Sequence, residues 1–142
     1  MSALKIAKEL VPYTSIVRST EDPWTWVFDI KGPAGSLYEG GTFRVSFKYP
    51  CDYPFRRPHV YFITPIHHPN VHFTGDKGLV YLKHLYNWSP STDTARLLQD
   101  LNELLIEPDV TEHYVPDLAR QYRDHREDFE TQARAKMMAS SI

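Results

Sequence analysis

One thiol is the side chain in this sequence most able to act as a nucleophile. Cys51 is the only cysteine among 142 residues, which excludes a disulfide within the chain and a zinc site built from several thiolates. A cysteine becomes reactive when its surroundings favour the thiolate and leave it accessible. Cys51 lies between Pro50 and Asp52, and no local pattern provides such surroundings. We therefore interpret it as a free structural thiol.

Three histidines close together are the second group that could do chemistry. His67, His68 and His72 are followed by Asp76, and imidazoles with carboxylates bind many metals. Their spacing matches no zinc motif, and Pro69 prevents a helix from aligning the rings. The pattern predicts no metal site, and no cofactor motif is present.

Hydrophobic periodicity indicates the strands of the fold. Apolar and polar residues alternate over residues 24–30 and again over 43–49, which is typical of two neighbouring antiparallel strands. A short apolar run at 60–63 predicts a third strand. Residues 64–90 have no clear period, but they are too apolar for disorder, so we expect a long ordered loop packed on the domain.

Helices are indicated near the N-terminus and again after residue 90. Apolar residues have helical spacing between residues 3 and 10. The best helix follows a cap at Ser91, Thr92 or Asp93, and its apolar stripe is Leu97, Leu98, Leu101, Leu104 and Leu105. A last helix is expected from about Pro116, with Leu118, Tyr122 and Phe129 on one stripe. Without a repeat or linker, this order predicts one α+β domain over residues 1–142.

Composition excludes several classes of function. Hydrophobic residues make up 42% and charged residues 24%, as in globular proteins, and no apolar run predicts contact with a membrane. The net charge is −2 and no basic stripe occurs, so we expect no nucleic-acid partner. Residues 1–8 lack the apolar stretch of a secretory signal, which favours a cytoplasmic or nuclear location.

A succession of short motifs rich in glycine, proline and aromatic residues carries a more specific signal. The motifs are, in order, Gly32-Pro33, Tyr38-Glu39-Gly40-Gly41, Phe43, Tyr49-Pro50, Asp52-Tyr53-Pro54-Phe55, Pro58, His68-Pro69-Asn70 and Trp88-Ser89-Pro90. In this order the chain resembles the ubiquitin-conjugating enzyme family. The resemblance implies an antiparallel four-stranded meander flanked by an N-terminal helix and C-terminal helices.

The resemblance fails at the family's nucleophile, a cysteine shortly after the His-Pro-Asn triplet that holds the C-terminus of ubiquitin as a thioester. Alignment on Trp88 and the Gly78-Leu79-Val80-Tyr81-Leu82 pattern places Tyr81 at that position. Alignment on His68-Pro69-Asn70 without an insertion places Gly78 there instead. Neither residue is a cysteine, so both alignments predict a catalytically inactive protein.

A tyrosine is a poor replacement for the thiol. A free cysteine titrates near pH ~8.5 and a tyrosine near ~10, so at neutral pH only about one tyrosine in a thousand is ionised. We therefore expect a packing role for Tyr81, with an ester on its hydroxyl as the alternative.

Other positions of the family can be carried over singly. The resemblance associates Asn70 with loop order and with the oxyanion of the transfer step, and without a cysteine we expect Asn70 to be structural. Lys83 stands where the family has an acidic residue, a charge reversal that disfavours lysine substrates. Glu112 occupies the acidic position in the loop before the last helix.

Partner-binding positions are better preserved. Phe55 and the turn with Trp88, Pro90 and Ser91 resemble the two loops by which the family binds ligases. Lys5 and Lys8 resemble the basic face of the first helix that meets the activating enzyme. The alternatives are a core position for Phe55, a turn-forming role for Pro90 and a solvated helix face for the lysines.

The leading hypothesis is an inactive binding or regulatory module of the ubiquitin pathway. Its partners would be a RING-type ubiquitin ligase or an active conjugating enzyme, with ubiquitin as a further non-covalent candidate. Three alternatives stay open: an active or partner-assisted conjugating enzyme with an atypical acceptor, a chain in which the cysteine was deliberately replaced, and a structural protein using the fold.

Overall fold

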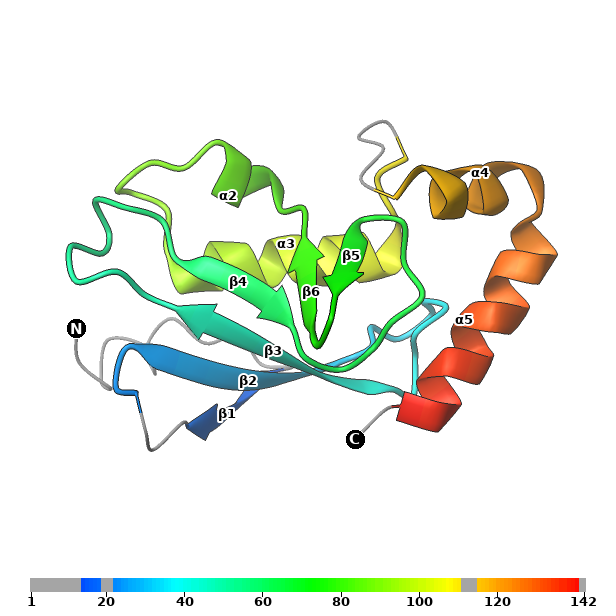
Figure 1. Cartoon of the computed structure of the whole chain (residues 1–142), viewed down its shortest axis with the longest axis horizontal. Helices are drawn as coiled ribbons and strands as arrows, with labels where there is room; N and C mark the ends of the chain where they lie inside the picture. Colours follow the sequence, from blue (N-terminus) through cyan, green and yellow to red (C-terminus); the bar gives the residue numbers. More distant parts are fainter. Residues whose placement is uncertain (1–13, 19–21, 111–114, 141–142) are drawn as a thin grey trace.

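A single antiparallel sheet with helices on one face and at one end forms the fold (Figure 1). The computed structural model describes residues 14–18, 22–110 and 115–140. The strands are β1 (Thr14–Arg18), β2 (Thr25–Lys31), β3 (Thr42–Lys48), β4 (His59–Phe62), β5 (Val71–Thr74) and β6 (Lys77–Val80). The helices are α2 (Lys83–Tyr86), α3 (Thr94–Ile106), α4 (Pro116–Asp124) and α5 (Arg126–Ser140).

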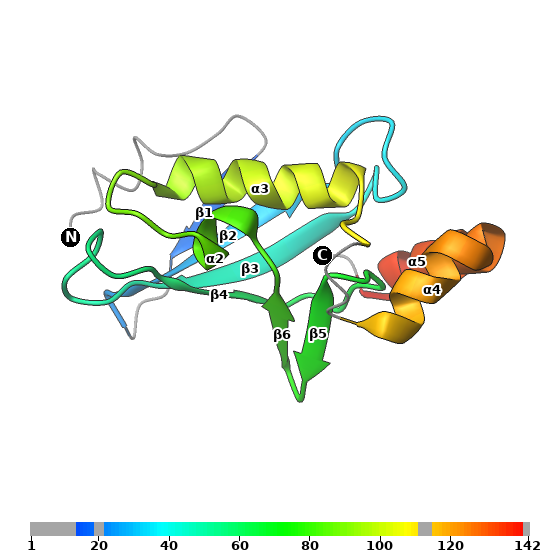
Figure 2. The same cartoon turned by 90° about the horizontal axis from the view of Figure 1, so that it is seen from above.

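The order of strands in the sheet is β1-β2-β3-β4-β6-β5. Strands β1 to β4 make the predicted four-stranded meander, and the hairpin of β5 and β6 extends it to six strands. Pairing between β4 and β6 is limited to Tyr61↔Leu79 and Phe62↔Gly78. Figure 2 shows the hairpin projecting from the side of the sheet opposite α3.

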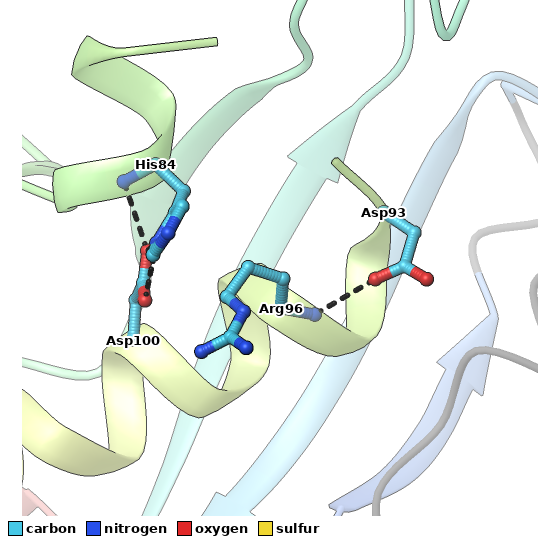
Figure 3. A network of polar contacts seen from close by, with 4 residues as sticks. All are labelled: His84, Asp93, Arg96 and Asp100. Atoms are coloured by element: carbon cyan, nitrogen blue, oxygen red, sulfur yellow. Dashed lines mark hydrogen bonds and ion pairs between the residues drawn. The ribbon is translucent and has the colours of Figure 1, made fainter. Parts of the chain in front are cut away.

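The core lies between the sheet and α3. Alternate residues of β2 and β3 are buried, as their period of two predicts, and the rings of Phe28 and Phe47 pack edge to face 5.1 Å apart. Helix α3 buries Leu97, Leu98, Leu101 and Leu105 against them. Asp93 caps this helix by accepting from the Arg96 N–H at 3.0 Å (Figure 3).

Two of the elements predicted from the sequence need correction, and a third lies outside the residues that the structure describes. The segment 64–90 is not a continuous loop, because it contains β5, β6 and α2. Each of these elements has four residues, too few for a period to be visible. The last helix is two helices, since the non-helical backbone of His125, with φ −137° and ψ 59°, separates α4 from α5. The predicted N-terminal helix lies outside the described residues. None of the described helices is long and apolar enough to cross a membrane.

Candidate functional site

Two loops that are distant in sequence are joined into one surface, which we call the paired loops (residues 50–58 and 87–93). The Trp88 indole N–H donates to the Pro54 carbonyl at 2.9 Å. The ring centroid of Tyr53 lies 6.0 Å from that of Trp88 and 4.8 Å from that of Tyr49. Tyr49 in turn shares a 2.6 Å hydrogen bond with the Thr94 hydroxyl at the start of α3. The loops are therefore fixed to each other and to the core.

The paired loops present apolar groups to solvent. Phe55 is 74% exposed, so it is not a core residue. Pro90 and Ser91 are also exposed, and the Ser91 hydroxyl is 2.8 Å from that of Ser89. Trp88 is half-buried, and its contact with Pro54 positions the loops. The structure thus brings together the predicted ligase-binding residues on one surface.

The candidate nucleophile positions lie in the segment 78–83, where β6 ends and α2 begins. Gly78 is buried inside β6. A Cβ at this glycine would lie 2.7 Å from Phe73 Cζ and 2.9 Å from Phe62 Cβ, so the site has no room for a side chain. Tyr81 is half-buried and lines a groove. Of the two positions, only Tyr81 therefore directs a side chain into accessible space.

Hydrogen bonds of the buried Asn70 hold this segment. The Asn70 carbonyl accepts from the Tyr81 N–H at 3.0 Å. Its side-chain amide donates to the Asp109 carbonyl at 2.6 Å and accepts from the Asp109 N–H at 2.8 Å. Asn70 therefore braces residue 81 against the chain that follows α3, which is a structural role.

His68 is a fully buried neighbour of this brace. Its Nδ1 accepts from the Asn70 N–H at 3.0 Å, so the proton is on Nε2, which donates to the Leu104 carbonyl at 2.8 Å. Both ring nitrogens are satisfied in the neutral form. Burial lowers the pKa of His68 to about 4. The histidine is thus a neutral structural link between the His-Pro-Asn turn and α3.

The groove beside Tyr81 is bordered by acidic residues of α3 and of the segment that follows it. It holds about 180 Å³, and its walls include Lys83, Asp100, Glu103 and Glu107. Glu103 and Glu107 are exposed, as is Lys83 at the start of α2. We call it the acidic groove. The positive charge of Lys83, which replaces an acidic residue of the family, therefore stands among carboxylates.

A buried carboxylate ties α2 to α3 on the wall of this groove (Figure 3). Asp100 has a side chain only 2% exposed, and its Oδ2 accepts from the His84 N–H at 3.0 Å. The His84 Nδ1–H donates to the same carboxylate at 2.8 Å. The two bonds satisfy a carboxylate that would otherwise be costly to bury, and they fix the orientation of α2.

Cys51 and the histidine cluster are separate from this segment. Cys51 is a free, exposed thiol in the loop between β3 and β4. The His67 ring is 2.8 Å from the Gln121 side-chain oxygen, whereas His72 is exposed on β5. In the part of the chain that the structure describes, no three His, Cys, Asp or Glu side chains gather as metal ligands.

Lys5, Lys8 and Glu112 lie outside the described residues, so their predicted roles stay predictions. Neither the Asp109 brace nor the acidic groove was predicted from the sequence. The groove has a sequence signal, because Asp100, Glu103 and Glu107 have the i, i+3, i+7 spacing of one helix face. The brace has none, since it joins a side chain to the backbone 39 residues away.

Comparison with known proteins agrees with this architecture. The model of the ubiquitin-conjugating enzyme family matches residues 3–137. The chain is 35% identical over 120 residues to the probable ubiquitin-conjugating enzyme E2 31 of Arabidopsis thaliana, covering 84% of this chain and 77% of that protein. The E2 domain of a Toxoplasma gondii ubiquitin conjugating enzyme superposes with a TM-score of 0.85 at 27% identity, covering 99% of this chain and all of that one. The chain therefore belongs to the ubiquitin-conjugating enzyme family and is a UBC-domain protein of the ubiquitin pathway.

Proposed function

We propose that this chain is a catalytically inactive binding or regulatory module of the ubiquitin pathway. Its partner is a RING-type ubiquitin ligase or an active conjugating enzyme, with ubiquitin as a further non-covalent ligand. One contrast carries the proposal. The paired loops expose Phe55 and Pro90, whereas the family's cysteine position is occupied by Tyr81 or Gly78.

The case for inactivity rests on the chemistry of position 81. Thioester formation needs a group that is both nucleophilic and readily ionised, and a phenol at neutral pH is ionised only to about one part in a thousand. Gly78 has no side chain, and its surroundings leave no room for one. Lys83 stands where the family has an acidic residue, but in the acidic groove it is surrounded by carboxylates of Asp100, Glu103 and Glu107, so its charge alone does not exclude a protonated lysine substrate.

Cys51 does not restore the chemistry in this proposal. It follows β3, whereas Tyr81 follows β6, so the thiol lies in a different loop from the segment that Asn70 braces. A transfer site needs the nucleophile beside groups that bind the developing charge.

The case for binding rests on the paired loops. Small interfaces concentrate their binding energy in a few apolar anchors, surrounded by contacts that are nearly neutral. Phe55 has the properties of such an anchor, because its ring is 74% exposed on a loop fixed by the Trp88–Pro54 hydrogen bond. A fixed loop loses little conformational entropy on binding.

The test is a calorimetric titration of the wild type and Phe55→Ala against a panel of RING-type ligase domains. We expect the substitution to weaken a ligase complex by about 1–3 kcal/mol and to leave the melting temperature nearly unchanged, since the ring is exposed. Ile106→Ala is the matched control, because Ile106 is 55% exposed but lies at the end of α3, outside the paired loops.

The outcomes separate the candidate partners. Loss of binding by Phe55→Ala but not by Ile106→Ala supports ligase recognition through the paired loops. If the wild type binds no ligase of the panel, the ligase partner is wrong, and an active conjugating enzyme is the partner to test next.

A further inference from the structure

A second groove lies on the other side of Tyr81, between β4 and α2. It holds about 340 Å³, within the size range of pockets that bind small ligands or a few side chains. Its origin is a divergence of strands. Tyr61 and Phe62 pair with β6, whereas His59 and Val60 are paired on the β3 side and, in the described part of the chain, have no partner on β6.

A guanidinium, an imidazole and aromatic rings line this groove. The Arg57 guanidinium lies at its wall and donates to the Leu85 carbonyl at 3.1 Å, which joins the start of β4 to α2. His59 follows on β4 and is exposed. On the opposite wall the rings of Tyr81 and Tyr86 have centroids 6.0 Å apart, and Tyr86 is 74% exposed.

The groove has no carboxylate among the described residues that line it, although the chain as a whole carries a net charge of −2. The contrast with neighbouring residues is sharp. Arg56 is neutralised by Asp52, whose carboxylate is 2.7 Å away. The hydrogen bond of Arg57 goes to a neutral carbonyl, so that contact leaves its positive charge uncompensated. We call this the basic groove.

We propose that the basic groove binds an acidic peptide segment of a partner protein. Carboxylates of the peptide meet Arg57 and His59, and an apolar or aromatic side chain packs against Leu85 and Tyr86. Charge complementarity selects an acidic ligand, because Arg57 in this groove would repel a basic peptide. The carboxylates that would attract a basic peptide line the acidic groove, on the other side of Tyr81. Arg57 and Pro58 belong both to this groove and to the paired loops, but the peptide contacts do not use Phe55, so peptide binding does not depend on ligase binding.

The test uses the full chain labelled with ¹⁵N and the capped peptide acetyl-Asp-Glu-Trp-Glu-Asp-amide, followed through backbone amide shifts. We expect a dissociation constant on the order of 1 mM for so short a ligand. The shifts should concentrate in residues 57–61 and 79–86. The neutral peptide acetyl-Asn-Gln-Trp-Gln-Asn-amide should bind about tenfold more weakly, and added salt should weaken the acidic peptide.

Charge-reversal variants locate the site. Arg57→Glu should weaken the acidic peptide about tenfold, and His59→Glu should weaken it in the same direction without removing the Arg57–Leu85 contact. Arg56→Glu is the matched control, since Arg56 precedes Arg57 but does not line the groove, and it should change binding by less than about twofold. The amide spectrum of each variant shows whether it folds.

Several results would overturn the proposal. They are no shifts at several times the expected dissociation constant, equal binding of the neutral peptide, shifts outside the two segments, or an Arg56→Glu effect as large as that of Arg57→Glu. Inorganic phosphate provides the last comparison. If phosphate produces the same shifts with similar affinity, the groove is a general anion site and the peptide proposal is wrong.

Discussion

The paired loops and the segment 78–83 are both held by hydrogen bonds, yet they offer solvent different chemistry. In the paired loops, the Trp88–Pro54 bond supports an exposed apolar ring at Phe55. In the segment 78–83, Asn70 accepts from the backbone N–H of Tyr81, and the side chain there is a phenol. One region keeps a surface suited to binding, whereas the other keeps its geometry without a thiol.

The difference is that residue 81 is held through its backbone, whereas the surface of the paired loops is made by side chains. The contact that places residue 81 is made by its backbone N–H, so it does not depend on the side chain at that position. The Asn70–Asp109 brace likewise uses the Asp109 backbone. The proposed binding through the paired loops would instead depend directly on side chains, above all Phe55.

The largest effect that we expect is a loss of stability in acid, caused by His68, the buried neighbour of Asn70. Burial lowers the pKa of His68 to about 4, below its usual value near ~6.5, so between these pH values the unfolded chain binds more protons than the folded one. Stability is therefore full above the unfolded pKa and falls as the pH is lowered from about 6.5 to about 4, by on the order of 3 kcal/mol. Urea unfolding across this range measures the slope.

The control for the acid effect is His68→Gln, whose amide can replace the Nε2–H donor to Leu104 but does not titrate. The variant should be less stable at neutral pH and should lose most of the slope between pH 6.5 and 4. An unchanged slope would show that other groups cause the acid sensitivity.

A second prediction distinguishes the two nucleophile positions. Gly78→Cys should lower the free energy of unfolding by about 1–3 kcal/mol, because its Cβ would collide with Phe73 and Phe62. Tyr81→Cys places a thiol at the half-buried position that lines the groove, so it should cost less and should restore charging with ubiquitin more readily. Urea unfolding and intact mass after incubation with activating enzyme measure both effects.

Charging of Gly78→Cys alone would contradict the assignment of position 81. Failure of both variants would show that the segment has lost more than its thiol.

The smallest effect concerns the bond between the paired loops. Trp88→Phe keeps an aromatic ring but removes the N–H that donates to Pro54, which should cost about 0.5–1.5 kcal/mol of stability. Because the bond positions both loops, ligase binding should weaken in parallel, and calorimetry with a ligase that binds the wild type measures this. A stable variant with weaker binding would sharpen the contrast, whereas unchanged binding would mean that Phe55 acts without the Trp88 contact.

Much of the fold followed from the sequence. The strict alternation in residues 24–30 and 43–49 predicted β2 and β3, because one face of each strand is buried beneath α3. The leucine stripe predicted α3, and Asp93 was among its predicted caps. The ordered motifs indicated the family, which the comparisons confirm.

The remaining features depend on contacts that one sequence does not show. Strands β5 and β6 are too short for periodicity, and their pairing depends on a turn at Gly75 with φ +66° and on a missing side chain at Gly78. The exposure of Phe55 could not be decided before its loop was placed. The basic groove arises from the divergence of β4 and β6, which no local pattern encodes.

Charging with ubiquitin is the most direct test of the central claim that the chain binds within the pathway but carries no ubiquitin. The wild type is incubated with ubiquitin-activating enzyme, ATP and ubiquitin, with an active conjugating enzyme as a parallel control, and its intact mass is measured. We predict the unmodified mass. An adduct released by thiol reagents would identify Cys51 as the acceptor, and an adduct stable to thiols but cleaved by hydroxylamine would indicate an oxygen ester such as one on Tyr81. Either adduct would contradict the account.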